Sequence, residues 1–237
     1  GSYLTNDEVY MLAENVLKLA QSSWDYSDIQ LNEIQIDCDW TESTRDQYFY
    51  FLKSLRKMCD DVTLSATIRL HQIKYPENTG IPPIDKGSLM CYNMDDMNNS
   101  ETENSIFSTT VLEQYINEST EYNEIPLSIA LPVFSWNLAY RNNKFVGIVR
   151  EIEGLENSSD FKSLGASQYQ VINSPWKYNL QKNDIIRHES AKPGDLEQSF
   201  ELLKTNLPYW NGEVIYFDLN KNVTKKYEKS ILPFPSN

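Results

Sequence analysis

The sequence predicts an α/β protein, and the most natural arrangement is a (β/α) TIM-barrel-like single domain over residues 1–237. Three observations support this prediction. Segments with the two-residue period of strands alternate along the chain with segments that have the 3.6-residue period of helices. One expected strand is apolar on both faces, as in a covered parallel sheet. The chain contains neither an internal linker nor a low-complexity tract, so the sequence itself gives no domain boundary.

The first third of the chain alternates helices and strands. Residues 5–20 carry apolar side chains at helical spacing and predict an amphipathic helix. Residues 33–40 alternate apolar and polar side chains and predict a strand with one polar face. Residues 43–58 return to helical spacing, and residues 63–71 resume the period of a strand.

The rest of the chain continues this alternation with shorter elements. Residues 126–134 form the apolar strand, and residues 135–151 resemble a hairpin that turns at 141–144. A complete eight-stranded barrel would need a first strand upstream of Ser2, or the strand 145–151 in its place, so the barrel is expected to be irregular or incomplete at its N-terminus. The remaining expected elements are strands at 88–94, 169–172, 184–189 and 214–219 and helices at 109–117 and 195–206.

The composition restricts the classes of partner. Asp and Glu number 34 against 21 Lys and Arg, and a net charge of −13 repels nucleic acid and anionic bilayers. No stretch approaches the roughly 18–20 apolar residues of a membrane span. Three distant cysteines indicate neither a disulfide framework nor a zinc site, and eight glycines leave little room for a phosphate or dinucleotide loop. We therefore expect no cofactor and no metal, although Asp37, Asp39, His71 and His188 could in principle converge on one.

The first two residues bear on where the protein works. Gly1-Ser2 resembles the scar of a cleaved tag, so a native signal or lipid-anchor segment would have been removed before the numbering begins. We expect an exported protein, either periplasmic or anchored by lipid at the cell surface.

Asp37 and Asp39 are the first candidate catalytic residues. They are two residues apart at the carboxyl end of the strand predicted over 33–40, so both project from one face of the end where barrel active sites lie. Two carboxylates this close would raise the pKa of one of them, which suits general acid/base chemistry. The alternative is that both acids cap the following helix or pair with Arg69.

Further candidates follow other strands. Arg69 and His71 are expected to share a face at the end of the next strand and to bind substrate, or else to form a structural ion pair. Tyr92, Asn93 and Trp136 follow later strands and provide aromatic and amide groups for binding. Glu189 is the candidate for a further catalytic acid, and its alternative role is a surface salt bridge with Arg187 or Lys192.

One short motif indicates a different chemistry. The segment 36–41 resembles the Asp-x-Asp-x-Thr signature of haloacid-dehalogenase-type phosphatases, in which Asp37 would be the nucleophile and Asp39 the acid/base in a magnesium-dependent reaction. That family also has a later lysine and an acidic motif. Gly194-Asp195 and Asp218 do not fit that acidic motif.

A resemblance covers residues 34–150. The segments 35–41, 67–75, 80–83, 90–94 and 130–136 resemble an uncharacterised family of bacterial exported proteins with a glycoside-hydrolase-like TIM barrel. The resemblance implies the fold and implies no catalytic residue.

The residues and the resemblance together predict a glycoside-hydrolase-like barrel that acts on or binds a carbohydrate or similar polyhydroxylated ligand through strand-end carboxylates and aromatic residues. In this hypothesis Asp37, Asp39 and Glu189 supply acid and base, and Arg69, His71, Tyr92, Asn93 and Trp136 bind the substrate. The alternatives are a non-catalytic glycan-binding or assembly protein and, more weakly, the phosphatase.

Overall fold

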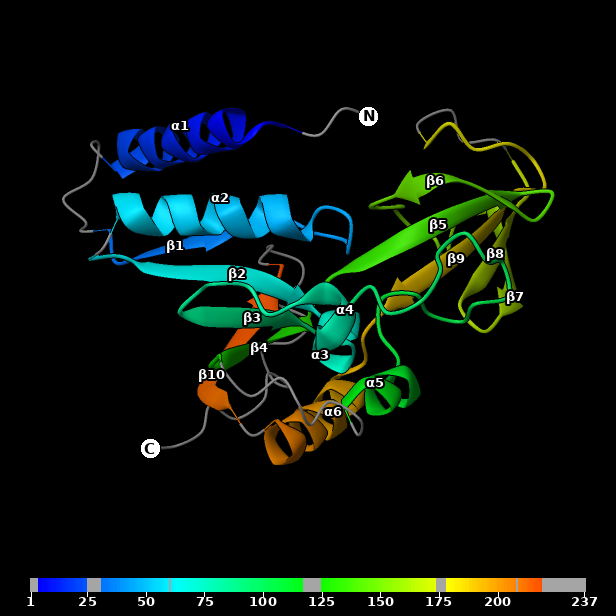
Figure 1. Ribbon diagram of the computed structural model, residues 1–237. Coiled ribbons are helices and arrows are strands. Elements are labelled where there is room, and N and C mark those ends of the chain that lie inside the picture. Colours follow the sequence, from blue (N-terminus) through cyan, green and yellow to red (C-terminus); the bar gives the residue numbers. More distant parts are fainter. Residues whose placement is uncertain are drawn as a thin grey trace. The chain divides into compact units, whose positions relative to one another are not determined.

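A computed structural model describes residues 4–24, 31–59, 61–116, 125–173, 178–207 and 209–218 (Figure 1). The helices are α1 (Asn6–Trp24), α2 (Arg45–Met58), α3 (Leu70–Lys74), α4 (Pro76–Thr79), α5 (Thr109–Ile116) and α6 (Pro193–Asn206), and the strands are β1 (Glu33–Ile36), β2 (Thr63–Arg69), β3 (Lys86–Met90), β4 (Leu127–Pro132), β5 (Ser135–Arg141), β6 (Lys144–Val149), β7 (Phe161–Gly165), β8 (Gln168–Val171), β9 (Ile185–Ser190) and β10 (Trp210–Phe217). The protein is therefore a mixed α/β structure, as the sequence predicts.

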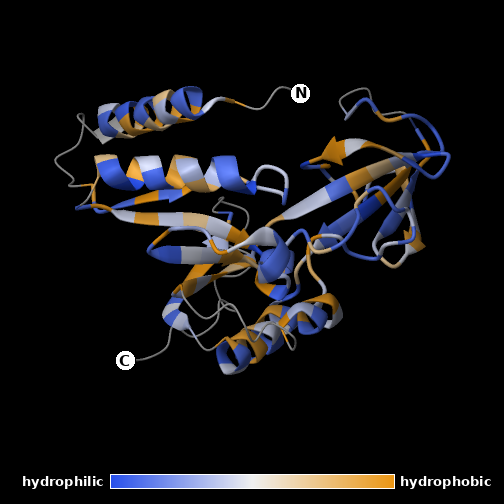
Figure 2. Ribbon diagram, viewed as in Figure 1, coloured by the Kyte–Doolittle hydropathy of each residue, from blue (hydrophilic) through white to orange (hydrophobic). Residues whose placement is uncertain are grey.

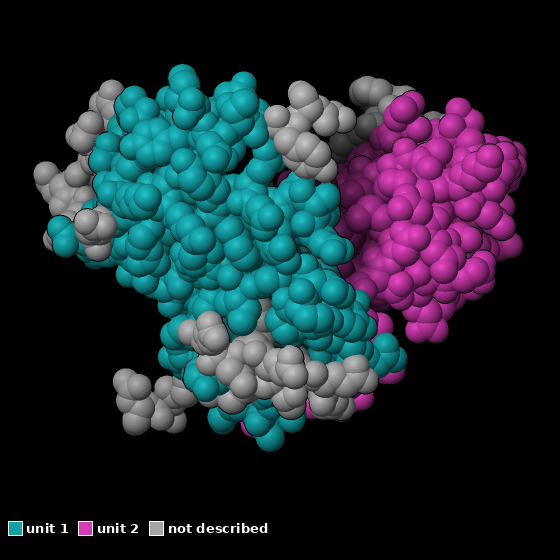
Figure 3. Space-filling model, viewed as in Figure 1, with its two compact units in different colours: residues 1–90, 114–129, 203–214 teal, residues 91–113, 130–202, 215–237 magenta. Residues whose placement is uncertain are grey.

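The chain divides into two compact units, each assembled from separate stretches of sequence (Figure 3). Unit 1 comprises residues 1–90, 114–129 and 203–214, and unit 2 comprises residues 91–113, 130–202 and 215–237. The single domain expected from the sequence stays a prediction.

The first sheet is parallel and has the order β1-β2-β3-β4-β10. β2 pairs in parallel with both β1 and β3. Amides of Gly87 and Cys91 donate to the carbonyls of Pro126 and Ala130, an equal advance along β3 and β4 that shows these strands to be parallel as well. Within the described residues this order has two ends, β1 and β10, and the closed barrel stays a prediction.

The two faces of this sheet differ in chemistry within unit 1. Figure 1 shows α1 and α2 on one side of the β1–β2 pair, where Leu52 and Leu55 of α2 are fully buried. The other face carries polar side chains. Lys86, at the start of β3, donates hydrogen bonds there to Glu33 and Glu213, each at 3.0 Å. Burial acts to lower the pKa of Lys86, and the hydrogen bonds to the two glutamates outweigh it and raise that pKa above its usual value. Figure 2 shows that polar and apolar residues are mixed along the strands of this sheet.

The second sheet is antiparallel and belongs to unit 2, with the order β6-β5-β9-β8-β7. The hairpin predicted at 135–151 is confirmed as β5 and β6, which turn through Asn142 and Asn143 with φ of 51° and 59°. Two consecutive residues at positive φ match the hand of a two-residue hairpin turn, and asparagine tolerates this conformation. The suggestion that residues 145–151 provide a barrel strand is wrong, because β6 lies at an edge of this antiparallel sheet.

Several boundaries differ from the sequence analysis. β1 ends at Ile36 rather than Trp40, and β3 occupies 86–90 rather than 88–94. β2 ends at Arg69, and α3 begins at the next residue, so the expectation of a strand through His71 is wrong. The apolar strand predicted at 126–134 is confirmed as β4, in which every side chain is buried. Position 219, the expected end of the last strand, lies outside the described residues.

Gly87 offers a test of how closely β3 is packed. A Cβ atom at this position would lie 2.7 Å from Leu127 Cδ2 and 3.0 Å from Ile68 Cγ1, and both of those side chains are buried. We predict that Gly87→Val lowers the free energy of unfolding by about 1–3 kcal/mol, because neither neighbour can move into solvent. Urea denaturation measures this change.

Gly194 in α6 is the matched control, because a Cβ there would meet nothing within 4 Å. Gly194→Ala should change the free energy of unfolding by less than about 1 kcal/mol. An equal effect of the two substitutions would contradict the close packing at Gly87.

Candidate functional site

Asp37, Asp39 and Arg69 lie together at the carboxyl ends of β1 and β2 in unit 1. Arg69 Nε and Nη2 donate to the two carboxylate oxygens of Asp39, and 53% of the Asp39 side chain is exposed. Asp37 Oδ1 accepts a hydrogen bond of 2.8 Å from Thr67 Oγ1. The alternative in which Arg69 pairs with a strand-end aspartate is thus observed for Asp39, and Asp37 is left to other partners.

His71 is close to this group but on a different element than expected. It lies in the first turn of α3, whose preceding residue Arg69 has its amide bonded to Gln72 Oε1 at 2.8 Å. Partial burial, and then the positive charge of Arg69, lower the pKa of His71, while Asp39 acts in the opposite direction. The imidazole is therefore neutral at pH 7 and can accept or donate a hydrogen bond.

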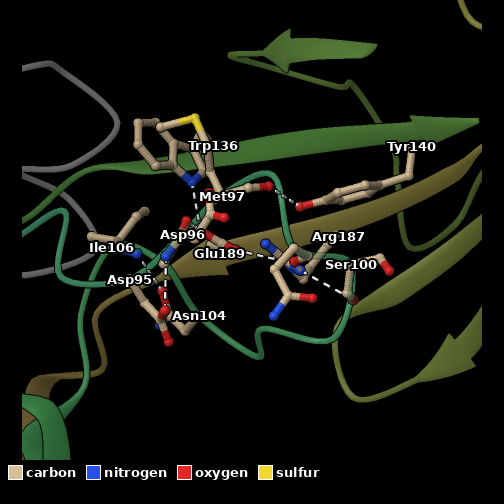
Figure 4. Close-up of polar contacts among 12 residues, drawn as sticks. Asp95, Asp96, Met97, Ser100, Asn104, Ile106, Trp136, Tyr140, Arg187 and Glu189 are labelled. Carbon is tan, nitrogen blue, oxygen red and sulfur yellow. Dashed lines mark hydrogen bonds and ion pairs between the residues drawn. The ribbon is translucent and has the colours of Figure 1, made fainter. Parts of the chain in front are cut away.

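Glu189 lies in unit 2 and is one of its most buried charged residues, with a relative exposure of 1%. Arg187 Nε donates to Oε1 at 2.6 Å, and Ser105 Oγ and Trp136 Nε1 donate to Oε2 at 2.6 and 2.7 Å (Figure 4). The pairing with Arg187 that the sequence offers as an alternative is present, but it is buried and not at the surface. A carboxylate with three donors positions its neighbours and is poorly placed to reach a substrate.

Arg187 is held from several directions as well. Its Nη1 donates to the backbone carbonyls of Asn99 and Ser100 at 2.9 and 3.3 Å, and its guanidinium lies 4.9 Å from the centre of the Tyr140 ring. Figure 4 shows the loop that contains Ser100 passing beside this arginine. The hydrogen bonds from Arg187 Nη1 to these two carbonyls therefore join β9 to that loop.

The strand pairing explains why neighbours on β9 have different surroundings. Trp136 lies opposite Glu189 and Asn137 lies opposite His188 in the antiparallel pair of β5 and β9. Directly opposite residues share a face, and successive residues alternate between faces. Trp136 and Glu189 thus occupy one face of the sheet, and Asn137 and His188 occupy the other.

A cavity of about 460 Å³ lies on the His188 face of unit 2. Asn137, Tyr169 and His188 line it together with the loop 150–157. Asn137 Nδ2 donates to the carbonyl of Val149 at 3.0 Å, so its Oδ1, 2.9 Å from His188 Nδ1, is the acceptor. This network assigns a proton to Nδ1 of His188.

Four aromatic residues form a cluster in unit 2. Tyr92 and Phe217 are stacked with ring centres 5.1 Å apart and an interplanar angle of 7°. Phe134 contacts both rings edge-on and also lies edge-on to Trp136. Phe217 remains 45% exposed. We call Tyr92, Phe134, Trp136 and Phe217 the aromatic cluster.

The structure thus brings the residues expected from the sequence into two groups. Unit 1 contains Asp37, Asp39, Arg69 and His71, and unit 2 contains Tyr92, Asn93, Trp136 and Glu189. Tyr92 and Trp136 both belong to the aromatic cluster. Asn93, the residue after Tyr92, is exposed and has a φ of 53°. The catalytic and binding roles of these residues stay predictions.

Several residues of these groups were missed by the sequence analysis. Phe134 and Phe217 follow or end their strands, and their position in the apolar pattern was the available signal. Ser105, Tyr140 and the hydrogen bond of Arg187 to the Asn99 carbonyl depend on contacts across 43–88 positions of sequence, which no local pattern reveals. Among the described residues no group of three or more His, Cys, Asp or Glu side chains could hold a metal ion. No described helix is both long and apolar enough to cross a membrane.

Comparisons with known proteins identify the fold only. No protein-family model and no curated protein sequence matches this chain. The spore cortex-lytic enzyme SleL of Bacillus cereus is structurally similar, with a TM-score of 0.52 and 14% identity over 95% of this chain and 50% of the SleL chain. The GH18 chitinase ChiB from the chitin utilization locus of Flavobacterium johnsoniae has a TM-score of 0.47 and 11% identity over 92% of this chain and 66% of its own.

This chain spans half the length of the SleL chain that it matches. At 14% identity, the likeness to SleL shows that this chain has a similar fold.

The titration of His71 tests the electrostatics at the ends of β1 and β2. We predict a midpoint below the ordinary value of 6.5, because burial and Arg69 disfavour the imidazolium. Since the unfolded chain binds this proton at about pH 6.5 and the folded chain only at lower pH, this histidine reduces stability as the pH falls below about 6.5. NMR spectra of the imidazole, assigned with a His71→Gln variant, measure the midpoint.

Arg69→Gln is the matched variant, and it should raise the midpoint of His71 because a repelling charge is lost and Asp39 is released. A midpoint of His71 at or above 6.5 in the unaltered chain would contradict the assignment.

Proposed function

We propose that this protein binds a carbohydrate chain, and that the aromatic cluster of unit 2 stacks against its sugar rings. The observation that carries this proposal is the arrangement of Phe217: Tyr92 supports one side of its ring, and nearly half of its surface is exposed. Pyranose rings have apolar faces of C–H groups, which gain by leaving water against a flat aromatic surface.

The contacts that hold the aromatic cluster in place favour binding as well. Trp136 is fixed by the hydrogen bond from its Nε1 to the buried Glu189, so the ring does not have to be ordered when a ligand arrives. Phe134 lies edge-on between Trp136 and Phe217 and keeps their separation fixed. A rigid aromatic surface loses little conformational entropy on binding.

Binding is favoured over cleavage because two of the candidate acids, Glu189 and Asp39, are already occupied by hydrogen-bond donors. Glu189 is buried and accepts from three donors, and Asp39 accepts both bonds of an arginine fork. Glycosidases need one carboxyl group that donates a proton and another that acts as base or nucleophile at the same bond. The fold likeness to the cortex-lytic SleL supports a carbohydrate as the ligand and does not extend to the reaction.

Phe217→Ala tests the proposal. Because the burial of a half-exposed phenylalanine face is worth about 1 kcal/mol or more, we expect affinity for a bound polysaccharide to fall about fivefold or more. Depletion isotherms with insoluble cellulose, chitin and peptidoglycan, which share β-1,4-linked pyranose rings, measure the affinity.

Tyr209→Ala is the matched control, since Tyr209 is 44% exposed and lies outside the aromatic cluster. It should bind as the unaltered chain does. The proposal fails if the unaltered chain binds none of the three polymers, or if the two variants lose the same affinity.

A second candidate function is hydrolysis of the bound glycan with Asp37 as acid or base. The favouring observation is that Asp37 is exposed at the carboxyl end of β1 and that, among the described residues, no group donates to its Oδ2. An exposed carboxylate with a free oxygen can exchange a proton with a glycosidic oxygen or a water molecule.

If Asp37 has this role, Asp37→Asn should reduce the release of reducing ends from the same polymers about 100-fold or more, because a general acid or base contributes about 10²–10⁴ in rate. Asp46→Asn, which alters a carboxylate that is 90% exposed, is the control and should keep the rate. The absence of reducing ends with the unaltered chain, or an unchanged rate in Asp37→Asn, would eliminate Asp37 as a catalyst.

A further inference from the structure

A second, smaller cavity lies on the opposite face of the antiparallel sheet in unit 2. Its volume is about 220 Å³, and its lining includes Arg187, Tyr140, Gln168, Glu101 and Glu103. Pockets for drug-sized ligands measure about 300–1,000 Å³, so this one fits a single ring and not a chain. None of its residues belongs to the aromatic cluster or to the strand-end acids.

The buried guanidinium in its lining has one nitrogen, Nη2, whose two N–H groups are unused by the described residues. Arg187 is 1% exposed, and its Nε and Nη1 are occupied by Glu189 and by the carbonyls of Asn99 and Ser100. Its Nη2 is buried and has no hydrogen-bond partner among the described residues. A buried N–H group without an acceptor lowers the stability of the folded protein by about 1–3 kcal/mol. An acceptor on a bound ligand would remove this cost.

The charges of the cavity determine which acceptor is suitable. Glu189 already balances the charge of Arg187, and Glu101 and Glu103 add two negative charges to the lining. A carboxylate or phosphate ligand would gain one bond from Nη2 and be repelled by these acids. A neutral hydroxyl group accepts from Nη2 and donates to a carboxylate, so it satisfies both.

We infer that this cavity is a binding site for one neutral, hydroxyl-bearing ring, such as a single sugar unit. Arg187 provides the donor, Glu101 and Glu103 provide acceptors for ring hydroxyls, and Gln168 on β8 closes the cavity on the strand that pairs with β9. The inference rests on the proposed function for the class of ligand, and it adds a second site that is separate from the aromatic cluster.

Titration of the ¹⁵N-labelled protein with glucose and with N-acetylglucosamine tests the inference by NMR. Because Arg187 is buried, its side-chain N–H signals report directly on an acceptor that reaches the guanidinium. We expect a saturable shift of these signals and of the backbone amides of residues 100–103. Acetate and inorganic phosphate are the anionic probes, and they should leave these signals in place.

Two variants locate the site without disturbing the buried ion pair. Gln168→Phe fills the cavity and should abolish the shift, whereas Lys162→Phe, an equal change at an exposed residue of β7 outside the cavity, should keep it. The double variant Glu101→Gln and Glu103→Gln should weaken sugar binding about tenfold, as expected for the loss of hydrogen bonds to charged groups.

The outcomes separate this inference from the proposed function. A sugar-induced shift that survives in Phe217→Ala, with or without polymer binding, supports the small cavity. The inference is overturned if neither sugar moves the Arg187 signals, if acetate or phosphate moves them and the glutamine variant binds those anions more tightly, or if Phe217→Ala removes the shift. Loss of polymer binding with the shift intact would refute the aromatic cluster alone.

Discussion

The buried ion pair between Arg187 and Glu189 is the constraint on which the described part of unit 2 depends. Two charges removed from water are costly unless hydrogen bonds satisfy the rest of both groups. Here Glu189 has Ser105 and Trp136 as further donors, and Arg187 has carbonyls of the loop near Ser100 as acceptors. The sheet and that loop must therefore fold together, and the orientation of Trp136 is a consequence of this electrostatic requirement.

The same strand provides two different surroundings because its side chains alternate. Arg187 and Glu189 form hydrogen bonds with the loop that contains Ser100 and Ser105, while His188 between them faces Asn137 and the larger cavity. One tripeptide thus contributes to the support of the aromatic cluster, to the lining of the small cavity and to the lining of the large one. Its pattern of three polar residues is explained by these separate contacts and not by a single shared site.

Local patterns predicted those elements whose burial follows from their own sequence. The helix at 45–58 and the apolar strand β4 carry their periodicity within a few turns or residues, and both are confirmed. The end of β2 was misplaced because Leu70 and His71 continue the alternation of the strand, although the backbone already turns into α3. The antiparallel sheet was not expected, since its pair β5 and β9 joins residues about 50 positions apart. The sequence offers ion pairs as the alternative roles of Asp39 and Glu189, and both pairs are present. The Glu189 pair is expected at the surface and is in fact buried, because its burial depends on a loop that is distant in sequence.

The contrast between the two ion pairs indicates where this protein can respond to a ligand. An exposed pair such as Asp39 with Arg69 contributes about 0–1 kcal/mol, because water competes for both groups. Arg69 can exchange this aspartate for a ligand acceptor at little cost in stability. Arg187 cannot exchange Glu189 in this way, since the acid would remain buried without its counter-charge. A ligand at Arg187 must therefore accept from Nη2, which the ion pair with Glu189 does not use. A ligand at the ends of β1 and β2 can instead compete with Asp39 for the guanidinium of Arg69.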